Sequence, residues 1–164
     1  MIARVIFLFV ILLSAGGCAT APEKGPRFTG LAENRPGYST LYIFRPHEFI
    51  GKAVWPEVFL NQTRVVGLTD SSYTVVYIKP GRYWIRTEKS HFYSGLGNMP
   101  GEITVEPDKV HFLLLDRKYD TRPGVPMSEA TLLYARWRLT DAREARSEIV
   151  RLRFVKPYVD TVEY

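Results

Sequence analysis

From Thr40 to Leu139 the apolar residues recur with a period of two, and this alternation limits what the chain can fold into. The alternating runs are rich in β-branched and aromatic residues and are separated by Pro, Gly, Asn and Asp, as in strands joined by turns. One run, Leu41 to Phe44, is apolar at every position and indicates a strand covered on both faces. The spacing predicts a mainly β fold of about seven to eight strands, an antiparallel β-sandwich or an open barrel.

Two short turn sequences indicate how these strands are joined. Asn61-Gln62 separates two alternating runs and predicts a hairpin, although Gln62 occupies a place where glycine is easier. Lys79-Pro80-Gly81-Arg82 has proline and glycine at the central positions of a type II turn. It predicts a second hairpin between the runs Tyr73 to Ile78 and Tyr83 to Glu88.

One segment near the C-terminus breaks the period of two. Asp141-Ala142-Arg143-Glu144 is a capping-box sequence, and the apolar residues that follow lie on one face of a helix. We therefore expect one C-terminal helix from about Ala142 to Val150. Residues 149–155 also alternate as a strand would, so helix and strand both stay open there.

The N-terminus has the composition of a secretory signal. Arg4 precedes an apolar run from Ile6 to Leu13, and small residues follow as far as Gly17. The run is too short to cross a hydrocarbon core about 30 Å thick. The only cysteine of the chain, Cys18, comes next.

This arrangement resembles a bacterial lipoprotein signal, in which small residues precede a cysteine that becomes acylated. The resemblance implies cleavage after Gly17, a diacylglyceryl group on the sulfur of Cys18, and an acyl chain such as palmitate on its amino group. No other cofactor is expected. Because Ala19 is not the aspartate common in inner-membrane lipoproteins, the resemblance implies the periplasmic face of the outer membrane. An alternative cut after Ala21, which fits the A-x-A rule, would release a soluble periplasmic carrier.

These observations divide the chain into four parts. We expect a signal peptide over 1–17, a lipidated N-terminus and flexible tether over 18–37, a β-sandwich-like domain over 38–156, and a C-terminal tail over 157–164. The tether prediction depends on the Pro and Gly residues there and on the scarcity of large apolar ones. As flexible coil, such a tether reaches roughly 20 to 25 Å, so the domain would stand clear of the lipid.

Four blocks of the domain, in their order along the chain, resemble a known family: Leu41-Tyr42-Ile43-Phe44-Arg45-Pro46, Val58-Phe59-Leu60-Asn61, Tyr73-Thr74-Val75-Val76 and Pro80-Gly81-Arg82-Tyr83. They are similar to the domain-of-unknown-function 2846 family of envelope lipoproteins, over roughly Tyr38 to Phe154. The resemblance implies a lipidated, β-rich envelope protein with no assigned activity. At the level of the fold alone, the chain is also similar to prealbumin-like and immunoglobulin-like sandwiches.

Positive charge is concentrated near the C-terminus. The chain has 22 basic and 17 acidic residues, and the signal peptide removes only Arg4. The candidate binding surface consists of six arginines: Arg136, Arg138, Arg143, Arg146, Arg151 and Arg153. In the periplasm its partners would be lipid or lipopolysaccharide phosphates, acidic peptidoglycan groups or an acidic envelope protein, and not nucleic acid. The alternative is that these arginines form a solvated face whose charge only keeps the domain soluble.

The sequence has no pattern typical of a catalytic or metal site. His47, His91 and His111 lie in separate segments without a second ligand at metal spacing, and there is no G-x-S-x-G motif. We therefore expect a binding or structural role, with no enzymatic activity, no catalytic residues and no metal. The alternative is a cell-wall hydrolase with its site in the loops 90–101 and 120–128.

The aromatic residues allow a carbohydrate platform as well. Trp84 or Tyr93 would serve as the platform if its side chain points outward. The other strand aromatics are expected to fill the two inner faces of the sandwich, as β propensity alone predicts: Tyr42, Phe44, Tyr73, Tyr77 and Tyr83.

Overall fold

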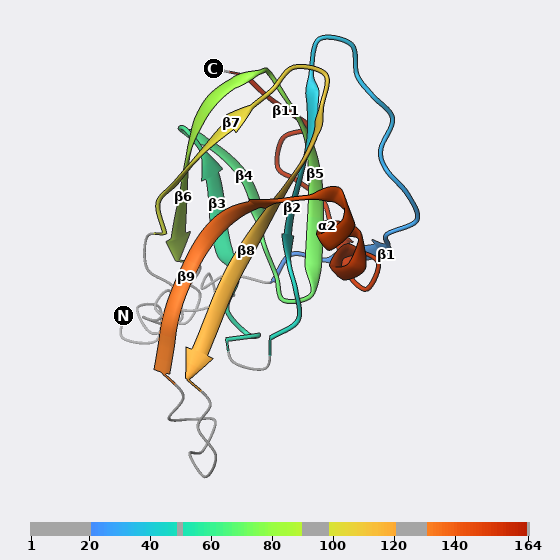
Figure 1. Ribbon diagram of the computed structural model, residues 1–164. Helices are drawn as coiled ribbons and strands as arrows, with labels where there is room; N and C mark the ends of the chain where they lie inside the picture. Colours follow the sequence, from blue (N-terminus) through green and yellow to red (C-terminus); the bar gives the residue numbers. More distant parts are fainter. Residues whose placement is uncertain (1–20, 49–50, 90–98, 121–130, 164) are drawn as a thin grey trace, which may run out of the picture.

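The computed structural model describes residues 21–48, 51–89, 99–120 and 131–163, which form two stacked β-sheets and one helix (Figure 1). The elements are β1 (Lys24–Arg27), β2 (Ser39–Arg45), β3 (Pro56–Leu60), β4 (Thr63–Gly67), β5 (Ser72–Ile78), β6 (Gly81–Lys89), β7 (Gly101–Val105), β8 (Val110–Asp120), β9 (Thr131–Thr140), α2 (Ala142–Ile149), β10 (Arg153–Val155) and β11 (Thr161–Val162). The mainly β sandwich with one C-terminal helix is confirmed, with more strands than the sequence predicts.

The larger sheet, sheet A, mixes parallel and antiparallel pairs. Its order is β1-β10-β5-β2-β8-β9, with β11 beside β5, and the smaller sheet B has the order β4-β3-β6-β7. β2 pairs in parallel with β8, and both β10 and β11 pair in parallel with β5. The prediction of antiparallel pairing is therefore wrong for these three pairs. Between β2 and β8 the chain passes twice through sheet B, so β8 re-enters sheet A in the direction of β2.

The two predicted hairpins have different outcomes. The Asn61-Gln62 hairpin is confirmed, because Leu60 pairs with Thr63. Asn61 alone takes the left-handed conformation there, with φ 54°, so Gln62 has no need to be glycine.

The Lys79 to Arg82 turn joins the two sheets instead of closing a hairpin. β5 belongs to sheet A and β6 to sheet B, and φ of Gly81 is 152°, far from the value of about 80° in a type II turn. The Tyr83 hydroxyl donates to the Lys79 carbonyl at 2.9 Å across the turn. Pro-Gly specifies a change of direction, but it does not specify which sheet the chain enters.

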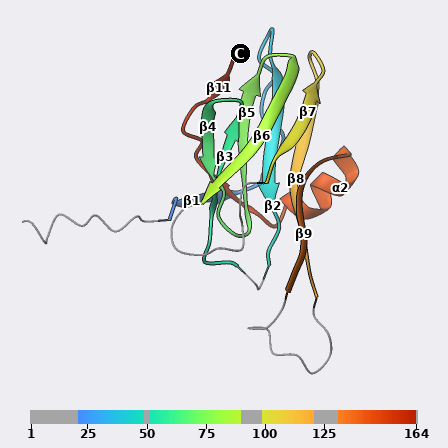
Figure 2. The same cartoon turned by 90° about the vertical axis from the view of Figure 1, so that its left-hand side faces the viewer.

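Sheet A is buried on both faces, as the unbroken apolar run in β2 predicts. Leu41 and Ile43 face the core between the sheets, while Tyr42 and Phe44 belong to a second cluster on the outer face. Helix α2, which Figure 2 shows next to β8, covers this outer face with Ala145 and Ile149, and Phe28 and Ala32 from the segment after β1 pack against the same cluster. The prediction that the strand aromatics fill the inner faces is wrong for Tyr42, Phe44 and Tyr73, and it is confirmed for Tyr83.

Both ends of the domain extend beyond the predicted boundaries. Within the predicted tether, β1 pairs antiparallel with β10, and Phe28 packs its ring 5.7 Å from that of Tyr73. Within the predicted tail, β11 pairs with β5 and Val162 is fully buried. Strands of four and two residues are too short for periodicity to reveal, and Gly25 and Pro26 are typical of loops.

Residues 149–155, for which the sequence allows helix or strand, contain the end of the helix and the start of a strand. The helix ends at Ile149, and β10 begins at Arg153.

Candidate functional site

The six candidate arginines fall into three pairs on successive elements. Arg136 and Arg138 lie on β9, Arg143 and Arg146 on α2, Arg151 in the turn before β10, and Arg153 at the start of β10. Each pair has different neighbours, so the three pairs differ in how much of their charge the protein itself neutralises.

The β9 pair is neutralised by carboxylates that the fold places opposite it. The Arg136 guanidinium lies 3.1 Å from Asp116 on β8, and Arg138 donates two hydrogen bonds to Glu144, of 2.9 and 2.6 Å. The hydrogen bonds from Arg138, followed by one from the Thr140 hydroxyl, lower the pKa of Glu144 to about 2. We call Arg136, Arg138, Asp116 and Glu144 the paired corner.

The α2 pair lies on the exposed side of the helix, with Arg143 in the first turn and Arg146 in the last. Asp141 caps the helix, because its side chain accepts hydrogen bonds from the backbone N–H groups of Arg143 and Glu144. The predicted capping box is thus half formed, since the Glu144 carboxylate binds Arg138. Arg143, Arg146 and Ala142 line an open hollow of about 370 Å³, and neither arginine forms an ion pair with an acid in the described ranges.

The third pair belongs to a larger group that the sequence analysis divided between the tether and the domain. In the register of β1 and β10, Arg27 lies opposite Arg153, and Lys24 lies opposite Val155. We call this group the basic edge; all of its members are exposed, and they are Lys24, Arg27, Arg151, Arg153 and Lys156. Within the part of the chain that the structure describes, none of them pairs with an acid, and the Arg153 guanidinium donates to the Gly25 carbonyl at 3.4 Å.

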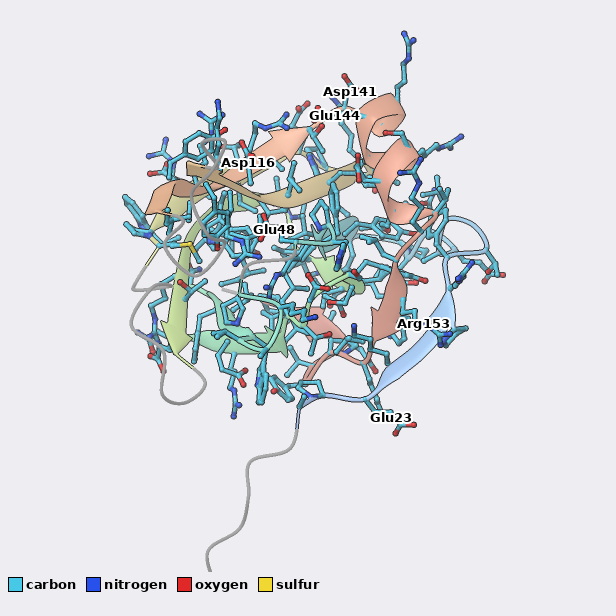
Figure 3. The ribbon with its side chains drawn as sticks, turned by 90° about the horizontal axis from the view of Figure 1, so that it is seen from below. Glu23, Glu48, Asp116, Asp141, Glu144 and Arg153 are labelled. Atoms are coloured by element: carbon cyan, nitrogen blue, oxygen red, sulfur yellow. The ribbon has the colours of Figure 1, made fainter. Side chains whose placement is uncertain are left out.

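Figure 3 shows that the basic edge and the paired corner lie on different sides of the molecule. Arg153 and Glu23 are on one side of the view, and Asp116, Glu144 and Asp141 are on the other. Lys24 and Arg27 gave no periodic signal in the sequence, so only the pairing of β1 with β10 reveals the edge.

Two buried arginines, which the sequence analysis did not single out, lie on the neighbouring strands β2 and β8. Arg45 is fully buried and donates to the carbonyl oxygens of Val54, Gly51 and Leu68. Arg117 is ion-paired with Glu48, which Figure 3 labels in the interior of the view. Burial, and then the charge of Arg45, lower the pKa of Arg117 to about 10. Because these groups bind the chain's own atoms, they fasten the segment after β2 to the sheet.

The two described histidines have structural partners. The Nδ1 atom of His47 lies 2.8 Å from Asp70, and Nε2 of His111 accepts a hydrogen bond of 3.1 Å from the Glu106 N–H. No group of three His, Cys, Asp or Glu side chains that could hold a metal occurs among the described residues. His91 lies outside them.

Several predicted features also fall outside the described residues. They include Cys18, Tyr93 and most of the loops 90–101 and 120–128, which were assigned to the hydrolase alternative. No helix in the described ranges has the length and apolar character needed to cross a bilayer.

A groove of about 600 Å³ lies on the outer face of sheet A, between the strands and the segment after β1. We call it the tyrosine groove; its lining includes Tyr42, Tyr73, Tyr77, Phe154, Glu33 and Asp160. Tyr73 is 7% exposed, and its hydroxyl has no hydrogen-bond partner among the described residues. Burial raises the pKa of both Tyr42 and Tyr73, so both phenols stay protonated at neutral pH.

Trp84, a candidate platform residue, points outward with 61% of its surface exposed. It lines a second hollow with Asn61, Arg82 and Glu163. Its backbone N–H donates to the Asn61 side chain at 2.9 Å. The ring therefore extends beside the β3–β4 hairpin.

One family model matches the chain. The family is described as a protein of unknown function, DUF2846, and the match covers residues 35–127. Comparison with curated proteins and with solved structures gave no match. The matched span contains β2 through β8 and the tyrosines of the groove, whereas α2, β10 and β1 lie beyond it.

Proposed function

The chain belongs to the DUF2846 family of proteins of unknown function, and we propose that it is a lipid-anchored bacterial envelope protein with a non-enzymatic binding or structural role. Its place is the periplasmic face of the outer membrane, with acyl chains attached at Cys18. Each buried methylene contributes about 0.8 kcal/mol, so several chains hold a protein firmly on a bilayer.

The observation that carries this proposal is the short distance along the chain between Cys18 and the first strand. β1 begins at Lys24, six residues after the cysteine. Six residues span at most roughly 20 Å, even when fully extended. The tether is therefore shorter than the sequence predicts, and the domain stays close to the headgroups.

The charge at this end of the domain suits such a position. The five residues of the basic edge are exposed, and Lys24 and Arg27 are on the strand nearest to the anchor. Lys and Arg within a Debye length of about 8 Å from an anionic leaflet contribute about 1 kcal/mol each. In this proposal the edge faces lipid phosphates, and the remaining surface is free to bind a second envelope component.

The test is the mass and partition of the mature protein from a bacterium with an outer membrane. We expect an N-terminus at Cys18 that carries three acyl chains, and recovery in the detergent phase after Triton X-114 separation. Cys18→Ser should move the protein to the aqueous phase, whereas the neighbouring Thr20→Ser should change nothing. A wild-type protein that begins at Pro22 and stays in water would instead identify a soluble carrier.

A further inference from the structure

We propose that the tyrosine groove binds an uncharged saccharide. The inference deepens the binding role proposed above and rests on it, but it does not depend on the anchor. It stands on three properties of the groove: its size, the hydrogen-bonding capacity that two phenols have left, and the charges around it.

The groove has the dimensions and the mixed lining of a small-molecule site. Its volume of about 600 Å³ lies within the range of ligand pockets, which combine aromatic walls with a few polar groups. The wall rings are fixed by contacts with one another, since Tyr73 lies 5.7 Å from both Phe28 and Phe154. A ligand would therefore meet a surface that is already formed.

Two phenols in the groove have unused hydrogen-bonding capacity. The Tyr42 oxygen accepts a hydrogen bond of 2.6 Å from the Ala32 N–H, so its own hydrogen is left to donate. The Tyr73 hydroxyl is without a partner in the described part of the chain, although the residue is more than nine-tenths buried. Both residues line the groove, so a ligand with hydrogen-bond acceptors can use the hydrogens that these hydroxyls have left to donate.

The charged residues at the groove indicate what else the ligand must offer. Glu33 and Asp160 line it with exposed carboxylates, which can accept from a ligand and which repel an anion such as a phosphate. Arg35 already occupies the cation position over the Tyr77 ring, at 5.2 Å from its centroid, which disfavours a cationic ligand.

These requirements together favour a saccharide over the other classes. A sugar hydroxyl both donates and accepts, so it can satisfy the phenols and the carboxylates at the same time. The carbon face of the sugar ring suits the aromatic wall. A fatty acyl chain would fill the volume, but its methylenes would give neither phenol an acceptor.

The test is saturation-transfer NMR with the full-length protein in micelles of a sugar-free detergent, such as lauryldimethylamine oxide. The probes are chitohexaose and maltohexaose, with dodecanoate and inorganic phosphate for the rejected classes. We expect at least one hexasaccharide to bind. Binding of chitohexaose alone would show that the groove requires an acetamido group, whereas binding of both would show that it does not.

The variant Tyr73→Phe removes only the unpartnered hydroxyl and should weaken saccharide binding about three- to tenfold, the effect of one hydrogen bond. Tyr134→Phe, on the exposed part of β9, is the matched control and should bind as the wild type does. Amide chemical shifts establish that each variant is folded.

Three results would overturn the proposal: no binding of either hexasaccharide, equal affinity in the two variants, or binding of dodecanoate or phosphate alone. None of them alters the mass or the partition of the protein, so the anchor is judged separately.

Discussion

The paired corner and the basic edge both place arginines on strands of sheet A, yet only the corner neutralises them. At the corner, Arg136 lies directly opposite Asp116 across β8 and β9, which is a favourable cross-strand pair. At the edge, Arg27 lies directly opposite Arg153, and like charges in that position destabilise a sheet. The comparison teaches that a count of basic residues in a segment does not give the charge that its surface presents.

The repulsion between the opposed arginines of the basic edge would be relieved by an external anion. A leaflet of anionic lipid would convert the repulsion between Arg27 and Arg153 into shared attraction. Arg136 and Arg138 have less to gain from such a partner, because Asp116 and Glu144 already hold them. Variants that remove equal charge from the two regions therefore separate them.

The largest expected difference concerns binding to lipid. In a Cys18→Ser background, replacing Lys24 and Arg27 by glutamine should weaken binding to phosphatidylglycerol vesicles about 30-fold, from about 1 kcal/mol per residue. Replacing Arg136 and Arg138 by glutamine removes the same charge and should weaken it less than threefold. Co-sedimentation at low salt measures both, and equal losses would remove the distinction between the two regions.

A smaller difference is expected in stability. Arg138→Gln breaks the two hydrogen bonds to Glu144 and should lower the free energy of unfolding by about 0.5–1 kcal/mol, since the pair is partly exposed. Arg153→Gln relieves the opposition to Arg27 and should leave the free energy unchanged or slightly higher. Urea denaturation measures both. A larger loss for Arg153 would show that its contact with the Gly25 carbonyl outweighs the repulsion.

The smallest effect is a dependence on pH that belongs to the corner alone. Because the folded pKa of Glu144 is about 2, below its usual 4.5, its contribution to stability is complete above pH 4.5 and disappears as the pH falls toward 2. A carbon-13 NMR titration of the Glu144 carboxyl should show this pKa. In Arg138→Gln it should rise toward 4.5, and an unchanged value would assign the shift to Thr140.

Local patterns in the sequence predicted those features of the fold that local interactions determine. The apolar run in β2 predicted a strand with two buried faces, and Asp141 predicted the start of α2. The crossing at Pro80-Gly81 was not predictable, because the same dipeptide suits a hairpin or a change of sheet. β1 was missed because it exists only through β10, more than 120 residues away.

The candidate surface was predictable in composition but not in grouping. Arg151 and Arg153 were named from the sequence, yet their neighbours Lys24 and Arg27 come from the other end of the chain. Arg45 was named only as part of a block that resembles the family, although it is fully buried. The tyrosine groove was missed because its residues were assigned to the inner core, and nothing in their spacing tells the outer face of a sheet from the inner one.

The pairing of β10 and β11 with β5 also means that sheet A can be completed only at the end of synthesis. β5 is made early in synthesis, but one of its two edges stays open until residues 153–162 arrive, and β1 then closes over β10. An open edge is a template for pairing with other chains. A nascent chain interrupted before residue 153 would thus expose an unpaired edge of β5 that is prone to aggregation. Such a chain would need a chaperone to stay soluble until the final segment is synthesised.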